Sequence, residues 1–528
     1  MGTISPNLYG HFAEHLGRCI YDGIWVGEDS PIPNEGGIRL DVVEALRQMR
    51  VPVLRWPGGC FADDYHWRDG VGPRDQRPTR TNLNWGGVET NQFGTHEFMA
   101  LCEMLGAEPY VCGNMGSGTV SEMRHWLEYL NCEEDTTLTR LRAANGHPEA
   151  FGVVYWGIGN ENWGCGGSMS PGHYAEEYKR YATFAAARNL YLYKVACGAN
   201  GDDWAWTRKF FETIRGVGTG GQDKLSLVNG YAVHYYAGTS GNPPDTAVNY
   251  DEDQWYQLLW QAARIEALVE EHRRIMDEFD PTRSVGLIVD EWGAWHRSTV
   301  SSTERRELGS LYQQNTIRDA LVAAVTLTTF NRRAHVVAMA NLAQLVNVLQ
   351  SPLLTKGDKL VRTPTFHAFE MMVPHHGTTS VRVDVWAPLV RFQVPEPPYY
   401  GPPAAGVPPS RDGRVTWGVG PVGTPPGSLQ QVWASASTRG PELVVSLVNA
   451  HAREPVEVVL DARGVGGRTP RPVEWRSLAA PGGDVHARND FNGPDVVRPE
   501  EVDPSEASGG VVHLPPASFH VLRFRLER

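Results

Sequence analysis

Between its start and residue 375, the sequence alternates eight times between a short apolar run and an amphipathic stretch. The apolar runs are rich in Val, Ile and Tyr and often end in Gly, which is typical of short β-strands. They are Asn7–Ala13, Val51–Pro57, Ala107–Gly113, Val153–Gly159, Tyr191–Gly198, Leu227–Tyr236, Val285–Asp290 and His335–Ala340. Strands that alternate with helices form a parallel sheet, and eight such units favour a closed barrel over an open sheet. The sequence therefore predicts a (β/α)8 TIM barrel.

The pattern changes beyond this point. Short β-prone runs such as Glu442–Val448 and His520–Leu526 replace the alternation, and turn residues separate them. This arrangement is typical of a β-sandwich. Within it, a segment rich in Pro and Gly at about 395–427 is expected to form an exposed loop. We therefore predict a catalytic barrel over residues 1–375 and a β-sandwich domain over residues 376–528.

Charge and hydropathy exclude several kinds of partner. The net charge of −13 argues against nucleic acid, because contacts with phosphate need clustered Lys and Arg. The sequence has no apolar run of about 18 residues, so we expect no membrane span. Its first residues lack the basic start and the apolar stretch of a signal peptide, which favours a cytoplasmic location.

The cysteines point to the same compartment. Their number is odd and their spacing matches no zinc pattern, so we expect free thiols in a reducing environment and no metal site. The seven residues are Cys19, Cys60, Cys102, Cys112, Cys132, Cys165 and Cys197.

Two glutamates follow predicted barrel strands directly. Glu161 comes after Val153–Gly159, and Glu291 comes at the end of Val285–Asp290. In a parallel barrel the ends of all strands meet at one face, where the chemistry takes place. For either glutamate alone, a salt bridge with a barrel arginine is an equally good explanation, but the pair favours catalysis. Cleavage of a glycosidic bond needs two such carboxyl groups, one to protonate the leaving oxygen and one to attack or to activate water.

The other strand ends carry polar groups and interleaved aromatic residues. Such groups suit hydrogen bonding to sugar hydroxyls and stacking on sugar rings. They are His11, Glu14, His15, Arg55, Trp56, Asn114, His234, Tyr235, Tyr236, Asn341 and Gln344.

Three other interpretations are weaker. Gly113–Gly118 follows a strand, as a nucleotide-binding turn does, but it lacks the G-x-G-x-x-G order. A binding protein without activity would not need both Glu161 and Glu291. A zinc site lacks the H-E-x-x-H spacing, although the sequence offers four candidate ligands, His11, His15, His234 and His296.

Several sequence motifs that follow one another in order indicate a specific protein family. The chain resembles the α-L-arabinofuranosidases of glycoside hydrolase family 51 over nearly its whole length. The matching stretches are Leu8–Arg18, Arg55–Phe61, Glu89–Thr95, Gly159–Trp163, His234–Tyr236, Asn341–Leu349 and His486–Phe491.

The resemblance implies a role for each matching residue. Glu161 corresponds to the acid/base of the family and Glu291 to its nucleophile, while Asn160 corresponds to the residue that binds the sugar 2-hydroxyl. Cys60 stands where some members carry Asn, and the alternative is that it is a small buried apolar residue. The positions implied to bind substrate are Glu14, Cys60, Trp85, Asn160, Tyr236 and Gln344.

The resemblance also implies an activity. It is that of a retaining, exo-acting glycoside hydrolase that releases terminal α-L-arabinofuranosyl residues and needs no cofactor. The alternatives are another furanoside, such as a galactofuranoside, or endo-cleavage of a glucan or xylan, because pocket shape decides between them. Relatives in this family often form homo-oligomers such as hexamers, and most carry a further stretch before Gly2–Ile4 that adds a strand to the sandwich.

Overall fold

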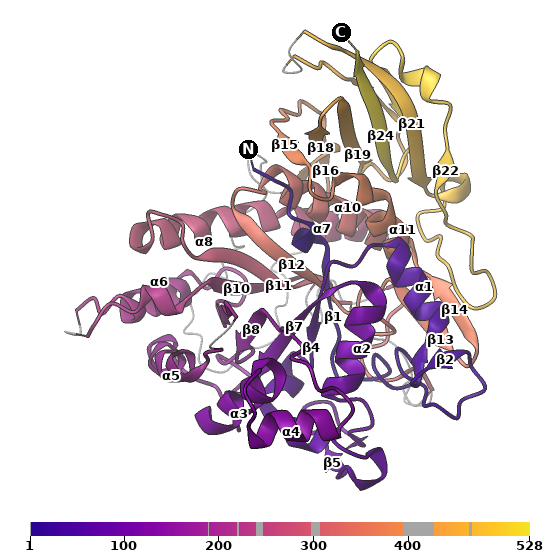
Figure 1. The fold of residues 1–528 in the computed structure, drawn as a ribbon. Helices are drawn as coiled ribbons and strands as arrows, with labels where there is room; N and C mark the ends of the chain where they lie inside the picture. The colour runs from indigo at the N-terminus through magenta and orange to yellow at the C-terminus, as the bar shows by residue number, and fades with distance from the viewer. Residues whose placement is uncertain are drawn as a thin grey trace.

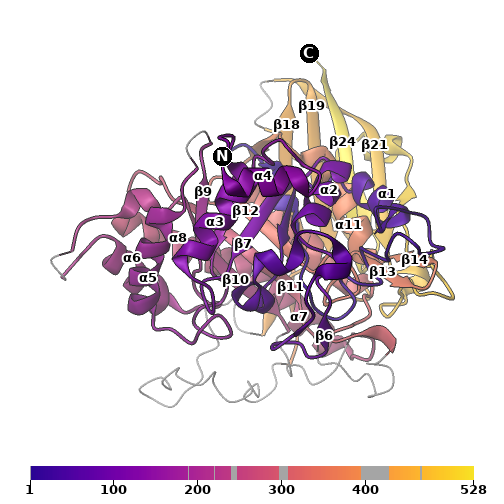
Figure 2. The same ribbon diagram turned by 60° about the horizontal axis from the view of Figure 1, so that its bottom comes forward.

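The computed structural model describes residues 2–187, 190–218, 221–238, 247–296, 307–393, 427–463 and 467–527. Its first part is a closed barrel of eight parallel strands surrounded by helices, and a sheet-rich domain packs on one side of it (Figures 1 and 2). The expected Pro/Gly-rich loop falls almost entirely outside the described residues. Among those residues, no helix has both the length and the apolar character needed to cross a membrane.

Each barrel strand falls on one of the eight predicted runs, which confirms the TIM barrel. Around the barrel the order is β1-β12-β11-β10-β9-β8-β7-β4. The strands are β1 (Gly10–Phe12), β4 (Val53–Trp56), β7 (Glu108–Gly113), β8 (Tyr155–Ile158), β9 (Tyr193–Ala196), β10 (Gly230–Ala237), β11 (Gly286–Ala294) and β12 (Val337–Ala343).

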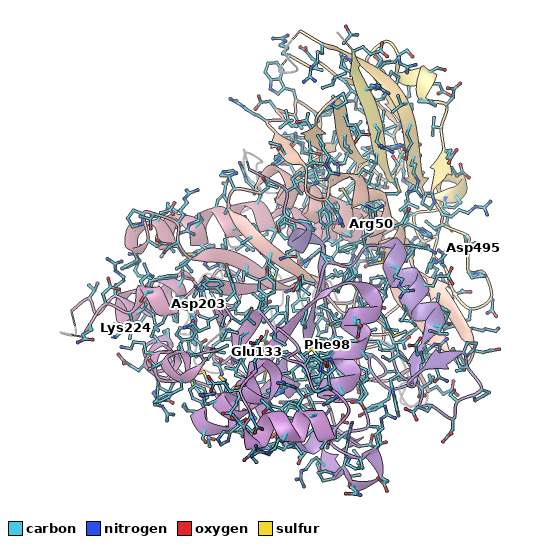
Figure 3. All side chains as sticks on the ribbon, in the orientation of Figure 1. Arg50, Phe98, Glu133, Asp203, Lys224 and Asp495 are labelled. Atoms are coloured by element: carbon cyan, nitrogen blue, oxygen red, sulfur yellow. A yellow bond between two sulfur atoms is a disulfide. The ribbon has the colours of Figure 1, made fainter. Side chains whose placement is uncertain are left out.

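The surrounding helices present their apolar sides to the strands. Phe98 of α2, labelled in Figure 3, stacks on Trp56 of β4 with ring centroids 4.8 Å apart. Ser170 caps α5 by accepting from the His173 amide, and Pro171 occupies its first turn. The helices are α1 (Leu40–Gln48), α2 (Thr95–Leu105), α3 (Val120–Asn131), α4 (Thr137–Ala144), α5 (Pro171–Phe184), α6 (Trp204–Ile214), α7 (Glu252–Ala263), α8 (Ile265–Phe279), α10 (Ile317–Arg332) and α11 (Pro364–Met372).

Side chains that point into the barrel change from apolar to polar along several of the strands. Because successive residues of a strand face opposite sides, Val53 and Arg55 of β4 share the inner face, as do Ala232 and His234 of β10. The apolar members form one buried layer, made of Val53, Tyr110, Val195, Ala232, Ile288 and Met339. This layer fills the barrel and leaves the polar residues at its carboxyl end.

The second domain is built on an antiparallel six-stranded sheet. Its order is β15-β18-β19-β24-β21-β22, and a two-stranded sheet of β20 and β23 packs on one face across an apolar cluster. The other face packs on α10, where Asn331 donates to Ser435 at 3.2 Å. The strands are β15 (Thr379–Val381), β18 (Val432–Arg439), β19 (Glu442–Asn449), β20 (Val456–Val459), β21 (Thr469–Ala479), β22 (Glu500–Glu501), β23 (Val511–Leu514) and β24 (Ser518–Glu527).

The N-terminal segment also joins this sheet. Thr3 forms an antiparallel bridge with Thr379, and the Ile4 amide donates to Thr378 at 2.8 Å. Short hairpins complete the fold: β2 (Asn34–Glu35) with β3 (Ile38–Arg39), β5 (Arg80–Thr81) with β6 (Val88–Glu89), β13 (Leu353–Lys356) with β14 (Lys359–Arg362), and β16 (Leu389–Arg391) with β17 (Ser428–Gln430).

Candidate active site

Two adjacent acidic residues of β11 both reach the barrel interior. In a regular strand Asp290 and Glu291 would point to opposite faces. Here the pairing with β10 skips Asp290, since His234 pairs with Glu291, and the extra residue makes a β-bulge. Tyr110 and Asn341 donate to the Asp290 carboxylate at 2.8 and 2.9 Å. The bulge therefore brings both carboxylates to the carboxyl end of the barrel.

Hydrogen-bond donors surround the Glu291 carboxylate. Arg55 donates to Oε1 at 2.8 Å, and the Tyr236 hydroxyl donates to Oε2 at 2.7 Å. Burial acts to raise the pKa of Glu291, but His234 and Arg55 outweigh it, and the pKa lies below its usual range. Glu291 is thus kept ionised, as an attacking carboxylate must be.

Glu161 lies in the loop after β8, where its φ of 44° is in the left-handed region. Its Oε1 is 2.9 Å from His234 Nδ1. Burial raises the pKa of Glu161; the hydrogen bond with His234 opposes this, the charge of Glu291 adds to it, and the net shift is upward. A carboxyl group in such surroundings holds its proton to higher pH and can donate it.

The two glutamates face each other beside His234. One oxygen of Glu161, one ring nitrogen of His234 and one oxygen of Glu291 all lie within 4.8 Å of one another. Retaining glycosidases hold their carboxyl groups ~5–5.5 Å apart, whereas inverting ones leave roughly 6.5–9.5 Å for a water. The spacing fits direct attack by a carboxylate. A cation bound by these three residues would meet the charge of Arg55, which already pairs with Glu291 at 2.8 Å.

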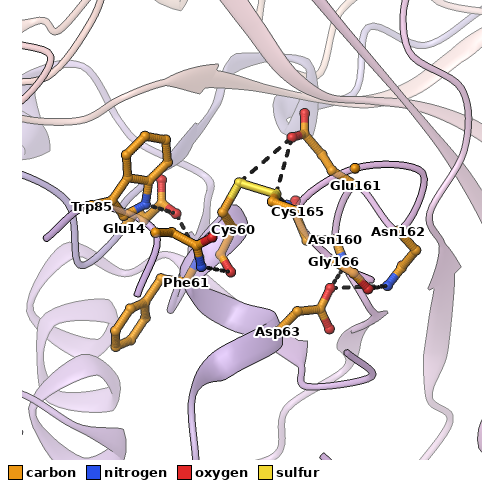
Figure 4. The surroundings of a disulfide bond; sticks show 12 residues. Glu14, Cys60, Phe61, Asp63, Trp85, Asn160, Glu161, Asn162, Cys165 and Gly166 are labelled. Atoms are coloured by element: carbon orange, nitrogen blue, oxygen red, sulfur yellow. Dashed lines mark hydrogen bonds between the residues drawn. A yellow bond between two sulfur atoms is a disulfide. The ribbon is translucent and has the colours of Figure 1, made fainter. Parts of the chain in front are cut away.

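Glu14, just after β1, is the centre of a second group. Its carboxylate accepts hydrogen bonds from Trp85 Nε1 at 2.9 Å and from the Phe61 amide at 3.0 Å (Figure 4). It also accepts from Gln344 Nε2 at 2.9 Å. Burial and the charge of Glu291 raise the pKa of Glu14 to about 7. Trp85 lies in the turn between β5 and β6, so a residue far from any barrel strand joins this group.

Arg55 is linked to the two remaining predicted residues, to Asn160 directly and to Tyr236 through Glu291. It donates to the Asn160 side-chain oxygen at 2.6 Å as well as to Glu291, which itself accepts from Tyr236. Asn160 precedes Glu161 in the β8 loop. With Glu14, Trp85 and Gln344, and with Cys60 described next, the structure brings all eight residues predicted from the sequence to one end of the barrel.

The cysteine prediction is wrong for one pair. Cys60 and Cys165 form a disulfide, with Cα atoms 5.5 Å apart (Figure 4). They are separated by 105 residues, and only the folding of two barrel loops toward each other makes them neighbours. Cys60 is also only partly buried, so it is not a small core residue. The two sulfur atoms lie 3.9 and 3.6 Å from Glu161 Oε2.

The other candidate interpretations are not supported by the geometry. Of the four histidines, His234 pairs with Glu161, His15 with Glu89 and His296 with Asp319, so these three do not converge on one ion. His11 packs against Phe369. In the glycine-containing turn after β7, the amides of Met115 and Gly116 donate to Asp63 rather than facing an open phosphate site.

Two important residues could not be identified from local sequence patterns. The sequence predicts Asp290 as the last residue of its strand, and a bulge that turns it inward cannot be seen in alternation alone. No predicted strand or motif includes Asp63. The only hint is an Asp-Asp pair placed just after the Gly-Gly-Cys turn that follows β4.

Comparisons with known proteins agree with this geometry. The family model described as Alpha-L-arabinofuranosidase 1 domain matches residues 45–237, and the Alpha-L-arabinofuranosidase C-terminal domain model matches residues 290–518. The chain is 46% identical over 388 residues, 72% of each chain, to an intracellular exo-α-L-arabinofuranosidase of Bacteroides ovatus.

Solved structures give the same result over the full length. The GH51 arabinofuranosidase from Xanthomonas axonopodis pv. citri is 36% identical with a TM-score of 0.85, covering 99% of this chain and 97% of that one. The α-L-arabinofuranosidase from Thermotoga maritima, in complex with arabinose, is 31% identical with a TM-score of 0.80, covering 100% and 98%. A family 44 xyloglucanase from Paenibacillus polymyxa, at 12% identity, shares the fold alone. The chain therefore belongs to glycoside hydrolase family 51, the α-L-arabinofuranosidases.

Proposed function

We propose that the protein is a retaining, exo-acting α-L-arabinofuranosidase with Glu291 as nucleophile and Glu161 as acid/base. One observation carries the assignment of roles. Two carboxyl groups with oxygens within 4.8 Å of each other have pKa values shifted in opposite directions, downward for Glu291 and upward for Glu161. Groups so paired divide the tasks of attack and proton donation.

In the first step the Glu291 carboxylate attacks the anomeric carbon of the sugar. The bond to the leaving oxygen breaks, and that oxygen takes the proton of Glu161. The products are a covalent ester between the sugar and Glu291, and an alcohol. Arg55 and Tyr236 hold the attacking carboxylate in place from two sides.

In the second step the same residues act in reverse. Once Glu291 is esterified, its negative charge is gone, so the pKa of Glu161 falls and the residue remains ionised. Glu161 then removes a proton from a water molecule, whose oxygen attacks the anomeric carbon and releases Glu291. Two inversions give net retention of configuration.

The remaining predicted residues would bind the terminal sugar. Glu14 and Gln344 offer a carboxylate and an amide at the ends of neighbouring strands. Trp85 lies next to them, because its Nε1 donates a hydrogen bond to Glu14. Asn160 is positioned beside Glu161 for the 2-hydroxyl, and the Cys60 disulfide lies next to the acid/base. The Bacteroides ovatus relative is named an intracellular exo-enzyme, and we extend both properties to this chain, together with a homo-oligomeric state and a domain division near residue 375.

The activity is tested with 4-nitrophenyl glycosides of α-L-arabinofuranose, galactofuranose, xylose and glucose. We expect the arabinofuranoside to have a kcat/KM at least about tenfold above each of the others, the scale on which a pocket distinguishes one missing or added group. Branched arabino-oligosaccharides should release only monosaccharide. Release of internal fragments, or preference for another sugar, would show that the proposal is wrong.

A further inference from the structure

A single buried carboxylate holds together the loops that surround the acid/base. Asp63 lies in the 3-10 helix Cys60–Asp64 that follows β4 and is 5% exposed. Its Oδ1 accepts from the amides of Met115 and Gly116, at 2.6 and 2.8 Å, in the loop after β7. A buried carboxylate with several N–H donors fixes those donors firmly, because each would otherwise lack a partner.

The second oxygen of Asp63 binds the loop that carries the acid/base. Its Oδ2 accepts from the Asn160 amide at 2.7 Å and from the Asn162 side chain at 3.2 Å (Figure 4). Asn162 also donates to the Gly166 carbonyl at 2.7 Å. Both neighbours of Glu161 in the chain are therefore fixed to the same carboxylate.

The packing around this contact leaves little freedom. A Cβ atom added at Gly166 would lie 2.0 Å from the Asn160 carbonyl and 2.4 Å from Asp63 Oδ2, and one added at Gly159 would lie 2.2 Å from Asn162. Glu161 itself has a left-handed φ of 44°, a conformation that residues other than Gly adopt at a cost. The anchored neighbours are what maintain that conformation.

We infer that Asp63 is a positioning residue for the acid/base Glu161, acting through Asn160 and Asn162 rather than on the substrate. This inference rests on the proposed function. It predicts that loss of the Asp63 carboxylate harms proton donation more than nucleophilic attack, because Glu291 lies on β11 and is held by Arg55 and Tyr236 instead.

The test is Asp63→Asn, assayed on aryl α-L-arabinofuranosides from 2,4-dinitrophenol to phenol. The amide supplies one acceptor oxygen in place of two and turns an NH2 group toward N–H donors. We expect kcat/KM to fall by about 10- to 100-fold for phenol, the scale of a misplaced catalytic group, and by less than about threefold for 2,4-dinitrophenol, which leaves without a proton. The dependence on leaving-group pKa should therefore steepen.

A matched control is Asp280→Asn. Asp280 is also buried and accepts from the amides of Ser284 and Val285, at 3.0 and 2.8 Å, but at the opposite end of the barrel, before β11. This variant should lower the melting temperature without changing the slope against leaving-group pKa. If Asp63→Asn is not folded, Asn162→Ser is tested instead, which removes the side-chain hydrogen bond from Asn162 to Asp63. It should steepen the dependence on leaving-group pKa to a smaller degree.

A double variant separates this inference from the proposed function. In a Glu161→Ala background the slope is already steep, and adding Asp63→Asn should leave it unchanged. Equal losses of kcat/KM on every leaving group, or a further steepening in that background, would overturn the role of Asp63. If Glu161→Ala itself leaves the slope unchanged, the acid/base assignment is what fails.

Discussion

The two glutamates of the site are held by different kinds of structure. Glu291 belongs to β11 and pairs with His234 of β10, and its neighbours Val289 and Trp292 pair with β12. Glu161 follows β8 in a loop, with a left-handed backbone, and side-chain contacts and a disulfide fix that loop. The barrel strands thus set the position of the nucleophile, whereas the position of the acid/base depends on a few residues outside the strands.

The electrostatic surroundings differ in the same way. Fixed donors, Arg55 and Tyr236, surround Glu291, and its pKa is lowered despite its burial. Among the described residues, His234 is the one side chain with a hydrogen to share with Glu161, and the pKa of Glu161 is raised. A preorganised ion pair suits a group that must stay charged. A group that gives and takes a proton needs a pKa that responds to the charge next to it.

The largest effect should come from removing the nucleophile. Glu291→Ala leaves no group to form the covalent ester, so kcat should fall by at least about 10⁴-fold on every substrate, whatever its leaving group. Hydrolysis of 2,4-dinitrophenyl α-L-arabinofuranoside measures this. Activity within tenfold of the unchanged enzyme would show that Glu291 is not the nucleophile.

Removal of the acid/base should have a smaller and selective effect. Glu161→Ala should lose about 10²- to 10⁴-fold on natural linkages, the usual contribution of a general acid, yet form the ester readily from 2,4-dinitrophenyl substrates. Added azide should then release a glycosyl azide of retained configuration, identified by NMR. An azide of inverted configuration would contradict the roles given to both glutamates.

The difference between the two glutamates also explains what could be predicted from the sequence. The eight strands follow from apolar periodicity, and both glutamates follow from the rule that strand ends meet at one face. That rule fixes which residues arrive at the site, but not what they contact. The sequence predicts Arg55 only as a polar residue at a strand end, whereas in the structure it contacts Glu291, Asn160 and Asp290.

No local sequence pattern predicts the contacts between loops. Asp63 and its partners lie in three loops that are separate in sequence, and Cys60 and Cys165 are 105 residues apart. Neither contact leaves a periodic signal, because loops have none. The resemblance to the family placed Cys60 at the site without showing its bond to Cys165.

The pH profile should reflect both pKa shifts. Activity should fall in acid as Glu291 gains a proton, below the usual range of a carboxyl group, and in alkali as Glu161 loses its own, above that range. Measured as kcat/KM on phenyl α-L-arabinofuranoside, whose leaving group needs the proton, the alkaline limb should be present in the unchanged enzyme and disappear in Glu161→Ala. Glu14, whose pKa is raised to about 7, still titrates in that variant. If the alkaline limb persists there, it reflects the titration of Glu14 and not of Glu161.

The smallest effect should come from the disulfide. Both sulfur atoms lie within 3.9 Å of Glu161 Oε2, and a disulfide has no hydrogen to donate. Reduction creates two S–H groups that can donate to the ionised carboxylate, which favours that form and lowers the pKa of Glu161. The alkaline limb should therefore move to lower pH. We expect the shift to be less than about one pH unit, so kcat/KM at neutral pH should fall by less than about tenfold.

The comparison requires kcat/KM profiles of the oxidised enzyme and of enzyme kept in a phosphine reductant. The thermal transition should also fall on reduction, since closing a long loop contributes about 2–4 kcal/mol of stability. Cys60→Ser/Cys165→Ser, which cannot form the bond, should show the same profile with and without reductant. If reduction leaves the alkaline limb of the unchanged enzyme in place, the disulfide does not influence Glu161. The hydrogen bonds of Asp63 would then be the main difference between the surroundings of Glu161 and those of Glu291.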